Sequence, residues 1–317
     1  MINERAVSVV VPNWNGAAYL GRTLDALRAQ HHQADEVIVV DNGSTDESLR
    51  LLAEKYDDMR VVALPRNTGF AGAANAGIRA ATGDLVAVLN NDARPRPDWL
   101  ARLVTQPDDP RVWAWGSVLV SPDGVVESAG DHYDPQGYAY KMAVGAQLDD
   151  LPSEPYAVFA PPGASPLMRR DVLDALGGYE ERFFLYYEDV DLSYRALLAG
   201  YTAVVVPDAV VEHDLARSSA GSARPWFYIG RNSLWCALRC QPHIDPLALT
   251  RRTRRELRTA RSRVPGAARA YLRGRAAGAL LAPWALWTRR TIQRNRRVDD
   301  ARITAVLDAP PLPRRLP

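Results

Sequence analysis

The stretch DLVAVLNND, from Asp84 to Asp92, joins a run of small apolar residues to two amides and a carboxylate. The run Leu85–Leu89 has the length and composition of a buried strand. Because Asn and Asp favour turns, its polar end is compatible with an ordinary turn. In an open α/β sheet, however, the carboxyl ends of the strands face the crevice where ligands bind. The stretch therefore predicts either a simple turn or a ligand site.

Strand and helix patterns alternate through the first hundred residues. Short apolar runs at 6–12, 36–41, 61–64 and 85–89 predict strands. Helical patterns at 17–30, 44–56, 71–81 and 98–104 follow them in turn, and Ser44 or Thr45 is expected to cap the second helix. This order predicts an α/β fold with a mainly parallel sheet flanked by helices.

Polar residues follow each of these four strands. The strand ends read PNWNG at 12–16, DNGSTD at 41–46, RNTGFAGAAN at 66–75 and NND at 90–92. Any one of them alone is compatible with a turn or with glycine packing. Four in succession indicate one ligand-binding rim along the carboxyl edge of the sheet.

The middle of the chain is less regular. Residues 112–120 and 125–130 predict a strand pair joined by the turn SPDG, and segments 131–140 and 149–156 are expected to be loops that cover the site. Glu188, Asp189 and Asp191 crowd the start of a predicted helix, where they are compatible with stabilising the helix dipole. A final strand, 203–213, ends on His213.

Charge is divided unevenly along the chain. The formal charge of +2 combines about +14 from Arg251 onward with about −12 before it, which suggests a negatively charged partner for the tail. The two cysteines, Cys236 and Cys240, are one helical turn apart and predict buried thiols. Since the sequence starts on a strand pattern without a basic and apolar leader, a cytoplasmic location is expected.

Several segments together resemble the family 2 inverting glycosyltransferases of the GT-A fold, most closely the bacterial rhamnosyl- and galactofuranosyltransferases. They are VSVVVPNWNG, EVIVVDNGSTDES, NTGFAGAANAGIRAATGDLVAVLNND, GASPLMRRDVLDALGGYEERFFLYYEDVDLSYRALLAGY and VVEH, in that family's order and spacing. The resemblance implies a GT-A catalytic domain over 1–225, with a nucleotide-sugar half to about 110 and an acceptor half from 111. A helical, arginine-rich extension is expected over 226–317.

The resemblance places the donor site on the predicted rim. Asp41 would accept a hydrogen bond from a pyrimidine N–H, and Gly69 would let the backbone approach the nucleotide closely. Arg231 would lie beside the diphosphate. The residues that the resemblance assigns to the nucleotide sugar are Pro12, Asn13, Trp14, Asn15, Asp41, Asn42, Arg66, Asn67, Gly69, Asn75, Asn90, Asn91 and Arg231.

Asn90-Asn91-Asp92 occupies the position of the family's Asp-x-Asp metal motif, with Asn90 in place of the first aspartate. Asp92 is expected to bind Mg²⁺ or Mn²⁺, because such ions take oxygen ligands and keep substrate phosphates in their shell. Asn90 would offer an amide oxygen to the sugar or to a metal-bound water. His213 matches a histidine that completes the metal shell in related enzymes, although a histidine at a strand end is often an ordinary polar residue.

Asp189 stands where the family keeps the base that accepts the proton of the acceptor hydroxyl. A single inverting displacement needs one such carboxylate, unlike the pair used in glycoside hydrolysis. Glu188 and Asp191 would orient Asp189 or bind acceptor hydroxyls. Gly163, Ala164 and Ser165 match the loop beneath the acceptor.

The implied donor is a dTDP- or UDP-linked sugar, with a rhamnose-like sugar favoured. The acceptor would be a glycan, a lipid-linked sugar or a small molecule, in cell-surface polysaccharide or glycolipid assembly. A nucleotidyltransferase is the nearest enzyme alternative, but PNWNG is not a glycine-rich basic triphosphate loop. A non-catalytic nucleotide-sugar-binding module is disfavoured by the presence of Asp41, Asp92 and Asp189, and no G-x-G-x-x-G motif supports a dinucleotide oxidoreductase.

The tail pairs arginines with Leu280, Leu281, Trp284, Leu286 and Trp287. This pattern favours a helix lying in an anionic membrane interface, at the inner face of the cell membrane. Packing on the catalytic domain is the main alternative, and nucleic acid is not expected as a partner. The apolar stretch 276–287 is too short to span a bilayer.

Overall fold

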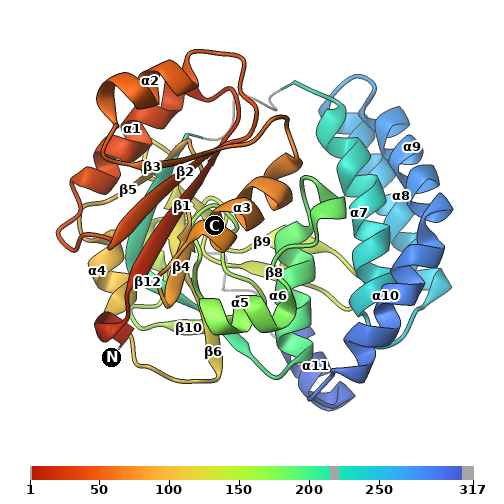
Figure 1. The fold of residues 1–317 in the computed structure, drawn as a ribbon. Helices are drawn as coiled ribbons and strands as arrows, with labels where there is room; N and C mark the ends of the chain where they lie inside the picture. The colour runs from red at the N-terminus through yellow and green to blue at the C-terminus, as the bar shows by residue number, and fades with distance from the viewer. Residues whose placement is uncertain (1, 215–220, 309–317) are drawn as a thin grey trace.

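The computed structural model describes residues 2–214 and 221–308 (Figure 1). At its centre is a 10-stranded sheet in the order β10-β12-β6-β11-β4-β1-β2-β3, with β5 paired to β12 and β7 paired to β6. The strands are β1 (Val7–Asn13), β2 (Glu36–Asp41), β3 (Arg60–Ala63), β4 (Leu85–Val88), β5 (Ala93–Pro95), β6 (Val112–Val120), β7 (Val126–Ser128), β10 (Tyr156–Val158), β11 (Leu167–Arg169) and β12 (Thr202–His213).

The nucleotide-side half of the sheet is parallel, as the sequence predicts. β1 lies between β2 and β4, and all three are parallel, with Asn13 directly opposite Asp41 at the carboxyl edge. β11 is antiparallel to both β4 and β6, so the sheet as a whole is mixed.

Helices cover both faces of the sheet. One apolar layer packs α1 (Ala17–Arg28), α2 (Ser48–Lys55) and α4 (Trp99–Val104) against one face. The opposite layer packs α3 (Gly69–Ala80), α5 (Arg170–Leu176) and α6 (Glu188–Leu198) against the other. Short 3-10 turns occupy η1 (Ile2–Glu4), η2 (Leu148–Asp150) and η3 (Glu181–Phe183). The result is a sheet buried between two helical layers, which accounts for its nearly continuous apolar strands.

The predicted cap of the second helix is wrong. α2 begins at Ser48, and the Ser48 amide donates to Asp46 Oδ1 at 3.1 Å. Ser44 and Thr45 lie before the helix, where they contact Asn15 across the rim. Serine and threonine serve turns as readily as caps, so tertiary contacts decided between the two uses.

The prediction of a loop at 131–140 is also wrong. β8 (Asp131–Tyr133) and β9 (Ala139–Lys141) form an antiparallel hairpin that pairs Asp131 with Lys141. Its turn is closed by Asp134, whose side chain accepts from the Tyr138 amide at 2.9 Å. The hairpin brings a carboxylate and an ammonium group towards the end of β7.

Five helices follow the sheet and form a further layer beside α6 (Figure 1). They are α7 (Arg224–Cys240), α8 (Pro246–Arg263), α9 (Ala267–Leu280), α10 (Ala282–Arg294) and α11 (Asp300–Leu307). α7 and α9 pack closely, since a Cβ built on Gly274 would fall 2.0 Å from the Phe227 carbonyl oxygen. Within the described residues, no helix has both the length and the apolar character needed to cross a bilayer.

Candidate active site

The ends of β1, β2 and β4 are joined by a chain of side-chain hydrogen bonds. Asn13, which is buried, donates to Asp41 Oδ1 at 3.5 Å and accepts from Asn91 Nδ2 at 2.7 Å. The Ser44 amide donates to the other Asp41 oxygen at 3.1 Å. Polar residues that follow three different strands therefore meet in one rim, as predicted, and Pro12 is buried beside them.

The loop after β1 lies on the surface of this rim. Asn15 has a positive φ of 51° and accepts from the Thr45 amide at 2.7 Å, while its own amide donates to Ser44 Oγ at 2.9 Å. Trp14 is 44% exposed beside it. An exposed indole at such a rim is suited to covering a flat base. The nucleotide assignments of Trp14 and Asp41 remain predictions.

The loop between β3 and α3 is held from inside by Asn42. The side-chain Nδ2 of Asn42 donates to Asn67 Oδ1 at 3.2 Å and to the Gly69 carbonyl at 3.0 Å. The side-chain Oδ1 of Asn42 accepts from the Thr68 backbone amide at 2.8 Å. Asn42 and Asn67 thus shape the loop, while the Arg66 side chain is exposed at its edge.

Two predicted nucleotide contacts are instead internal contacts. A Cβ built on Gly69 would fall 2.3 Å from the Phe184 carbonyl oxygen, so this glycine allows the loop before α6 to approach. Asn75 is buried, donates to the Tyr179 carbonyl at 2.8 Å and accepts from the Tyr179 amide at 2.9 Å. The geometry of both residues therefore supports packing of α3 against the segment before α6, and not the predicted role.

Asp92 and His213 meet at the end of the site where β5 pairs with β12. His213 Nε2 lies 3.2 Å from Asp92 Oδ1, and His213 Nδ1 lies 2.8 Å from Glu127 Oε2. Burial lowers the pKa of His213, but the Asp92 and Glu127 carboxylates outweigh it and raise that pKa to about 9. The predicted pair is thus brought together by strands that are far apart in the sequence.

The donor set at this point suits a divalent cation. His213 Nε2 is buried and has no hydrogen-bond partner among the described residues, although a carboxylate oxygen is nearby. An imidazole nitrogen and a carboxylate that converge in this way are metal-ligand chemistry. No group of three or more His, Cys, Asp or Glu side chains with metal-binding geometry occurs in the described ranges. A cation here would therefore complete its shell with water and substrate phosphate, as Mg²⁺ commonly does.

Asn90 links this end of the site to the loop Gly163–Ser165. The Asn90 amide donates to the Ala164 carbonyl at 2.9 Å, and Ser165 is buried with its carbonyl accepting from Ser117 Oγ at 3.2 Å. Asp189 lies against the same loop, at Gly163. A Cβ built on Gly163 would fall 2.6 Å from Asp189 Oδ2. The predicted base and the segment that carries Asp92 therefore both contact one short loop.

Glu188, which is buried, and Asp189, which is half-buried, form a carboxylate pair at the start of α6. Burial raises the pKa of Asp189, while the Val190 amide, which donates to Asp189 Oδ1 at 2.8 Å, opposes the rise. Burial and the neighbouring Asp189 charge raise the pKa of Glu188 well above its usual value, and Glu188 Oε2 has no hydrogen-bond partner within the described part of the chain. The two carboxyl groups therefore titrate as a pair, and Asp189 is the more accessible member.

Asp191 does not join this pair. Its carboxylate is fully buried and contacts Arg195 Nε at 2.7 Å and Arg239 Nε at 2.9 Å. Burial raises the pKa of Asp191, but Arg239 and Arg195 outweigh this and hold it below its usual value. Asp191 ties α6 to α7, so the predicted role in orienting Asp189 or binding the acceptor is not supported by its geometry.

The loop before α6 is strained and is held by α7. Phe184, Tyr186 and Tyr187 all have positive φ, which is costly for aromatic residues. Asn232 Nδ2 donates to the carbonyls of Phe183, Leu185 and Tyr186 at 2.6–2.9 Å. α7 therefore fixes the path of the chain directly before Glu188 and Asp189.

Arg231 takes part in the same support. Its guanidinium donates to the carbonyls of Arg182 at 3.0 Å and Phe183 at 2.8 Å, and lies over the Trp235 ring at 4.5 Å from the centroid. Burial lowers the pKa of Arg231. These contacts replace the predicted diphosphate contact with a structural role.

Sequence reasoning missed Glu127 and Lys141. They flank a segment expected to be a loop, and only the β8–β9 hairpin brings them together. An isolated carboxylate inside the apolar segment VVESAG was the one available signal for Glu127.

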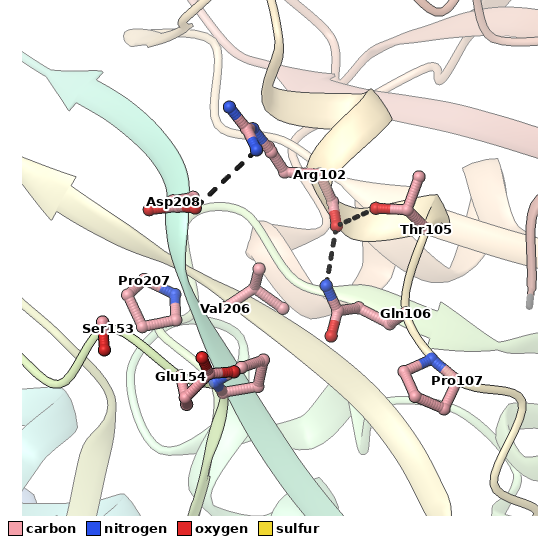
Figure 2. A pocket seen from close by; sticks show the side chains of 10 residues that line it. Arg102, Thr105, Gln106, Pro107, Ser153, Glu154, Val206, Pro207 and Asp208 are labelled. Atoms are coloured by element: carbon pink, nitrogen blue, oxygen red, sulfur yellow. Dashed lines mark hydrogen bonds and ion pairs between the residues drawn. The ribbon is translucent and has the colours of Figure 1, made fainter.

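A separate cavity of about 370 Å³ lies away from this site (Figure 2). It is lined by Arg102, Gln106, Glu154, Pro207 and Asp208 among others, with Arg102 3.7 Å from Asp208. None of the predicted site residues lines it. Asp208 precedes His213 on β12, on the order of 16 Å away along an extended strand. The cavity is thus distinct from the rim.

Curated relatives share long stretches of this sequence. The O-antigen biosynthesis protein RfbC of Myxococcus xanthus is 30% identical over 264 residues, which cover 77% of this chain and 20% of that protein. An N-acetylglucosaminyl-diphospho-decaprenol L-rhamnosyltransferase of Mycobacterium tuberculosis is 29% identical over 67% of this chain and 76% of its own. A pre-mycofactocin glycosyltransferase of the same species is 33% identical, and this chain spans 43% of its length.

Solved structures share the fold. A mannosyltransferase of Pyrobaculum calidifontis, in complex with GDP-Man and Mn²⁺, has a TM-score of 0.56 at 23% identity and covers 96% of this chain and 87% of its own. TarS 1-349 of S. aureus in complex with UDP-GlcNAc has a TM-score of 0.57 at 18% identity, with 92% and 89% covered. The expected GT-A fold, with helices following the sheet, is therefore confirmed. Residues 8–177, more than half of the chain, match the family described as glycosyl transferase family 2, and the chain belongs to that family.

Proposed function

We propose that this chain is a metal-dependent inverting glycosyltransferase that moves a sugar from a nucleoside diphosphate to an acceptor hydroxyl. The observation that carries the proposal is that one loop, Gly163–Ser165, lies against Asp189 at Gly163 and binds Asn90, two residues before Asp92, at Ala164, while Asp92 pairs with His213. Transfer needs a base at the acceptor and positive charge at the leaving diphosphate, and these two groups provide sites for both.

Asp189 supplies the base. Its carboxylate lies against the loop at Gly163, where an acceptor hydroxyl would approach it. In its ionised form Asp189 accepts the proton of the acceptor hydroxyl as that oxygen attacks the anomeric carbon. The attack comes from the side opposite the leaving group, so one displacement inverts the configuration.

Asp92 and His213 would hold Mg²⁺ or Mn²⁺. Such an ion, when bound, neutralises the charge that develops on the leaving diphosphate. The side chain of Asn90 is then available to the sugar, while the Asn91 amide holds Asn13 and so keeps the neighbouring strand end in place.

We infer a dTDP- or UDP-linked donor with a rhamnose-like sugar, and a glycan or lipid-linked acceptor in cell-surface polysaccharide assembly. The exposed Trp14 and the buried carboxylate of Asp41, both at the rim, support a pyrimidine nucleotide. The rhamnosyltransferase and the O-antigen protein among the relatives support this choice of substrates. TarS, which has been solved with UDP-GlcNAc, supports a uridine nucleotide as the alternative to thymidine.

A panel of nucleotide sugars tests the function. Sugar transfer or slow donor hydrolysis, measured as release of nucleoside diphosphate, should require Mn²⁺ or Mg²⁺ and should stop with EDTA. Asp189→Asn should lower turnover by about 10²–10⁴-fold. The mechanism would be contradicted if turnover were unchanged both in the presence of EDTA and in the Asp189→Asn variant.

We also propose that the C-terminal helices bind the inner face of the cell membrane. Leu280 is 80% exposed at the end of α9 and Trp287 is 68% exposed on α10, with Leu281 and Leu286 also exposed near them. Exposed arginines, including Arg273 and Arg290, lie on the same two helices. Apolar side chains among cations suit an anionic lipid surface. Trp284 does not join them, because its ring packs against Trp235 with centroids 5.1 Å apart.

Liposome sedimentation tests this surface. Leu280→Glu and Trp287→Glu should weaken binding to vesicles that contain phosphatidylglycerol, while Leu49→Glu, at an exposed site on α2, should not. Point variants are preferable to truncation because α9 covers α7 closely. Equal binding of all three variants and the unaltered chain would reject the membrane surface.

A further inference from the structure

Glu127 is a buried carboxylate that the proposed reaction does not use. It lies on β7 with its side chain 5% exposed, and its two oxygens have different partners. Oε2 is 2.8 Å from His213 Nδ1, while Oε1 pairs with Lys141 Nζ on the β8–β9 hairpin. Because one oxygen of this buried carboxylate pairs with Lys141 and the other with His213, its orientation is fixed.

The contact decides what the other nitrogen of His213 can do. A neutral imidazole carries its hydrogen on one ring nitrogen and a lone pair on the other. A cation held by Asp92 would take the place of the proton on Nε2, so the remaining hydrogen is on Nδ1, donated to Glu127, and the lone pair is on Nε2. Nε2 is the nitrogen that lies 3.2 Å from Asp92 Oδ1.

We propose that Glu127 is a positioning residue that makes His213 a metal ligand, by fixing the hydrogen on Nδ1 and directing Nε2 towards the cation held by Asp92. Histidine ligands of metals are commonly oriented by a carboxylate in this way, and loss of the carboxylate weakens metal binding by about 10–100-fold. The inference rests on the metal dependence of the proposed function but not on the identity of any sugar.

Lys141 extends this arrangement to the acceptor side. Its ammonium group balances the buried charge of Glu127, and it comes from the strand that pairs with Asp131. The positive charge of Lys141 also opposes the rise in the pKa of Asp189 that burial causes. The β8–β9 hairpin, expected from the sequence to be a loop cover, therefore contributes a charge to both ends of the site.

A simpler alternative is that Glu127 only pairs with a protonated His213, without any consequence for a cation. The two possibilities differ in how substitutions combine. If Glu127 acts through His213, its removal has no effect on metal affinity once His213 is gone. If it contributes only general negative charge, its removal weakens binding in either background.

The experiment is a double-mutant cycle on Mn²⁺ affinity. Free Mn²⁺ is measured by electron paramagnetic resonance as it is titrated into the full chain, with and without UDP. Glu127→Gln should weaken Mn²⁺ binding by about 10–100-fold. His213→Ala should weaken it at least as much, and Glu127→Gln should add nothing in the His213→Ala background. Glu154→Gln, at an exposed carboxylate, is the matched control and should bind as the unaltered chain does.

A second readout is the choice of cation. Imidazole favours Mn²⁺ over Mg²⁺, so Glu127→Gln should lower the ratio of the two affinities towards that of His213→Ala. If Glu127→Gln fails to fold, as judged by its Tm, Lys141→Met tests the same link from the other oxygen and should also lower that ratio.

Unchanged Mn²⁺ affinity in Glu127→Gln, equal weakening in both His213 backgrounds, or no Mn²⁺ binding by the unaltered chain would each overturn the inference. The predicted changes in Mn²⁺ affinity, in a chain that turns over no nucleotide sugar, would support the inference and overturn the proposed function instead.

Discussion

Asp189 Oδ2 lies so close to Gly163 that a Cβ on that glycine would fall 2.6 Å from it. At the next residue, the Ala164 carbonyl accepts from the Asn90 backbone amide at 2.9 Å and so joins the loop to the segment that carries Asn90 and Asp92. One loop thus sets the position of the base relative to the predicted cation, and the absence of a side chain at residue 163 is part of the site's geometry.

Gly163→Ala should therefore displace the Asp189 carboxylate while leaving the nucleotide rim intact. Displacement of a catalytic group by about 1 Å costs on the order of 10²-fold in rate. We expect kcat to fall by about that factor with little change in the Kd of UDP, measured by calorimetry. Gly21→Ala, on α1, is the control and should leave both unchanged. A kcat equal to that of the unaltered chain would show that the contact is unimportant.

The rate should fall at acid pH as Asp189 gains a proton. Burial raises the pKa of Asp189, so the acid limb of kcat/KM should lie above the range of an ordinary aspartate. The rate falls, and does not rise, as the pH is lowered, because only the ionised form of Asp189 can accept a proton. The residual activity of Asp189→Asn should lack this limb. An unchanged acid limb in that variant would assign it to another group.

Glu188→Gln should stabilise the protein increasingly as pH rises. The folded-state pKa of Glu188 is raised by burial and by Asp189, so its contribution to stability is complete below the unfolded-state pKa and is lost as pH rises through the folded-state value. Glutamine cannot ionise and escapes this loss. The Tm difference between variant and unaltered chain should thus be small near pH 4 and larger near pH 8. A difference that shrinks with pH would contradict the raised pKa of Glu188.

Asn232→Ala should impair both stability and catalysis. It leaves the carbonyls of Phe183, Leu185 and Tyr186 without their shared donor and releases a strained loop. The expected loss is about 1–3 kcal/mol in the free energy of unfolding, measured by urea denaturation. kcat should fall as well, because Asp189 follows this loop directly. Asn295→Ala, at an exposed position after α10, should change neither quantity.

Asp92→Asn and Asn90→Asp should differ in their effect on the cation. Asp92 is the carboxylate beside His213 Nε2, so Asp92→Asn should abolish measurable Mn²⁺ binding in the absence of nucleotide. Asn90→Asp restores the carboxylate that relatives of this family carry and should change kcat only modestly. Mn²⁺ titration measures the loss of metal binding in Asp92→Asn, and donor hydrolysis measures kcat of Asn90→Asp. Full activity of Asp92→Asn would show that Asp92 is not needed to bind the cation.

Local sequence was sufficient for the strands and for the rim. The runs at 6–12, 36–41 and 85–89 are buried strands because apolar and β-branched residues of that length have few other stable uses in a fold of this size. Asn13, Asp41 and Asn91 could be expected to meet, because the carboxyl ends of parallel strands lie on one edge. The match to glycosyl transferase family 2 also follows from sequence alone.

Only the tertiary structure decided which polar side chains face the site and which hold the fold. Asp191 and Arg231 are charged residues that the sequence assigns to the site. In the structure, however, Asp191 pairs with Arg239, and Arg231 binds backbone carbonyls. Glu127 has no sequence motif, yet it lies against His213 across 86 residues of chain. A local pattern records the secondary structure of a residue but not its partner, because the partner depends on how distant strands and helices pack together.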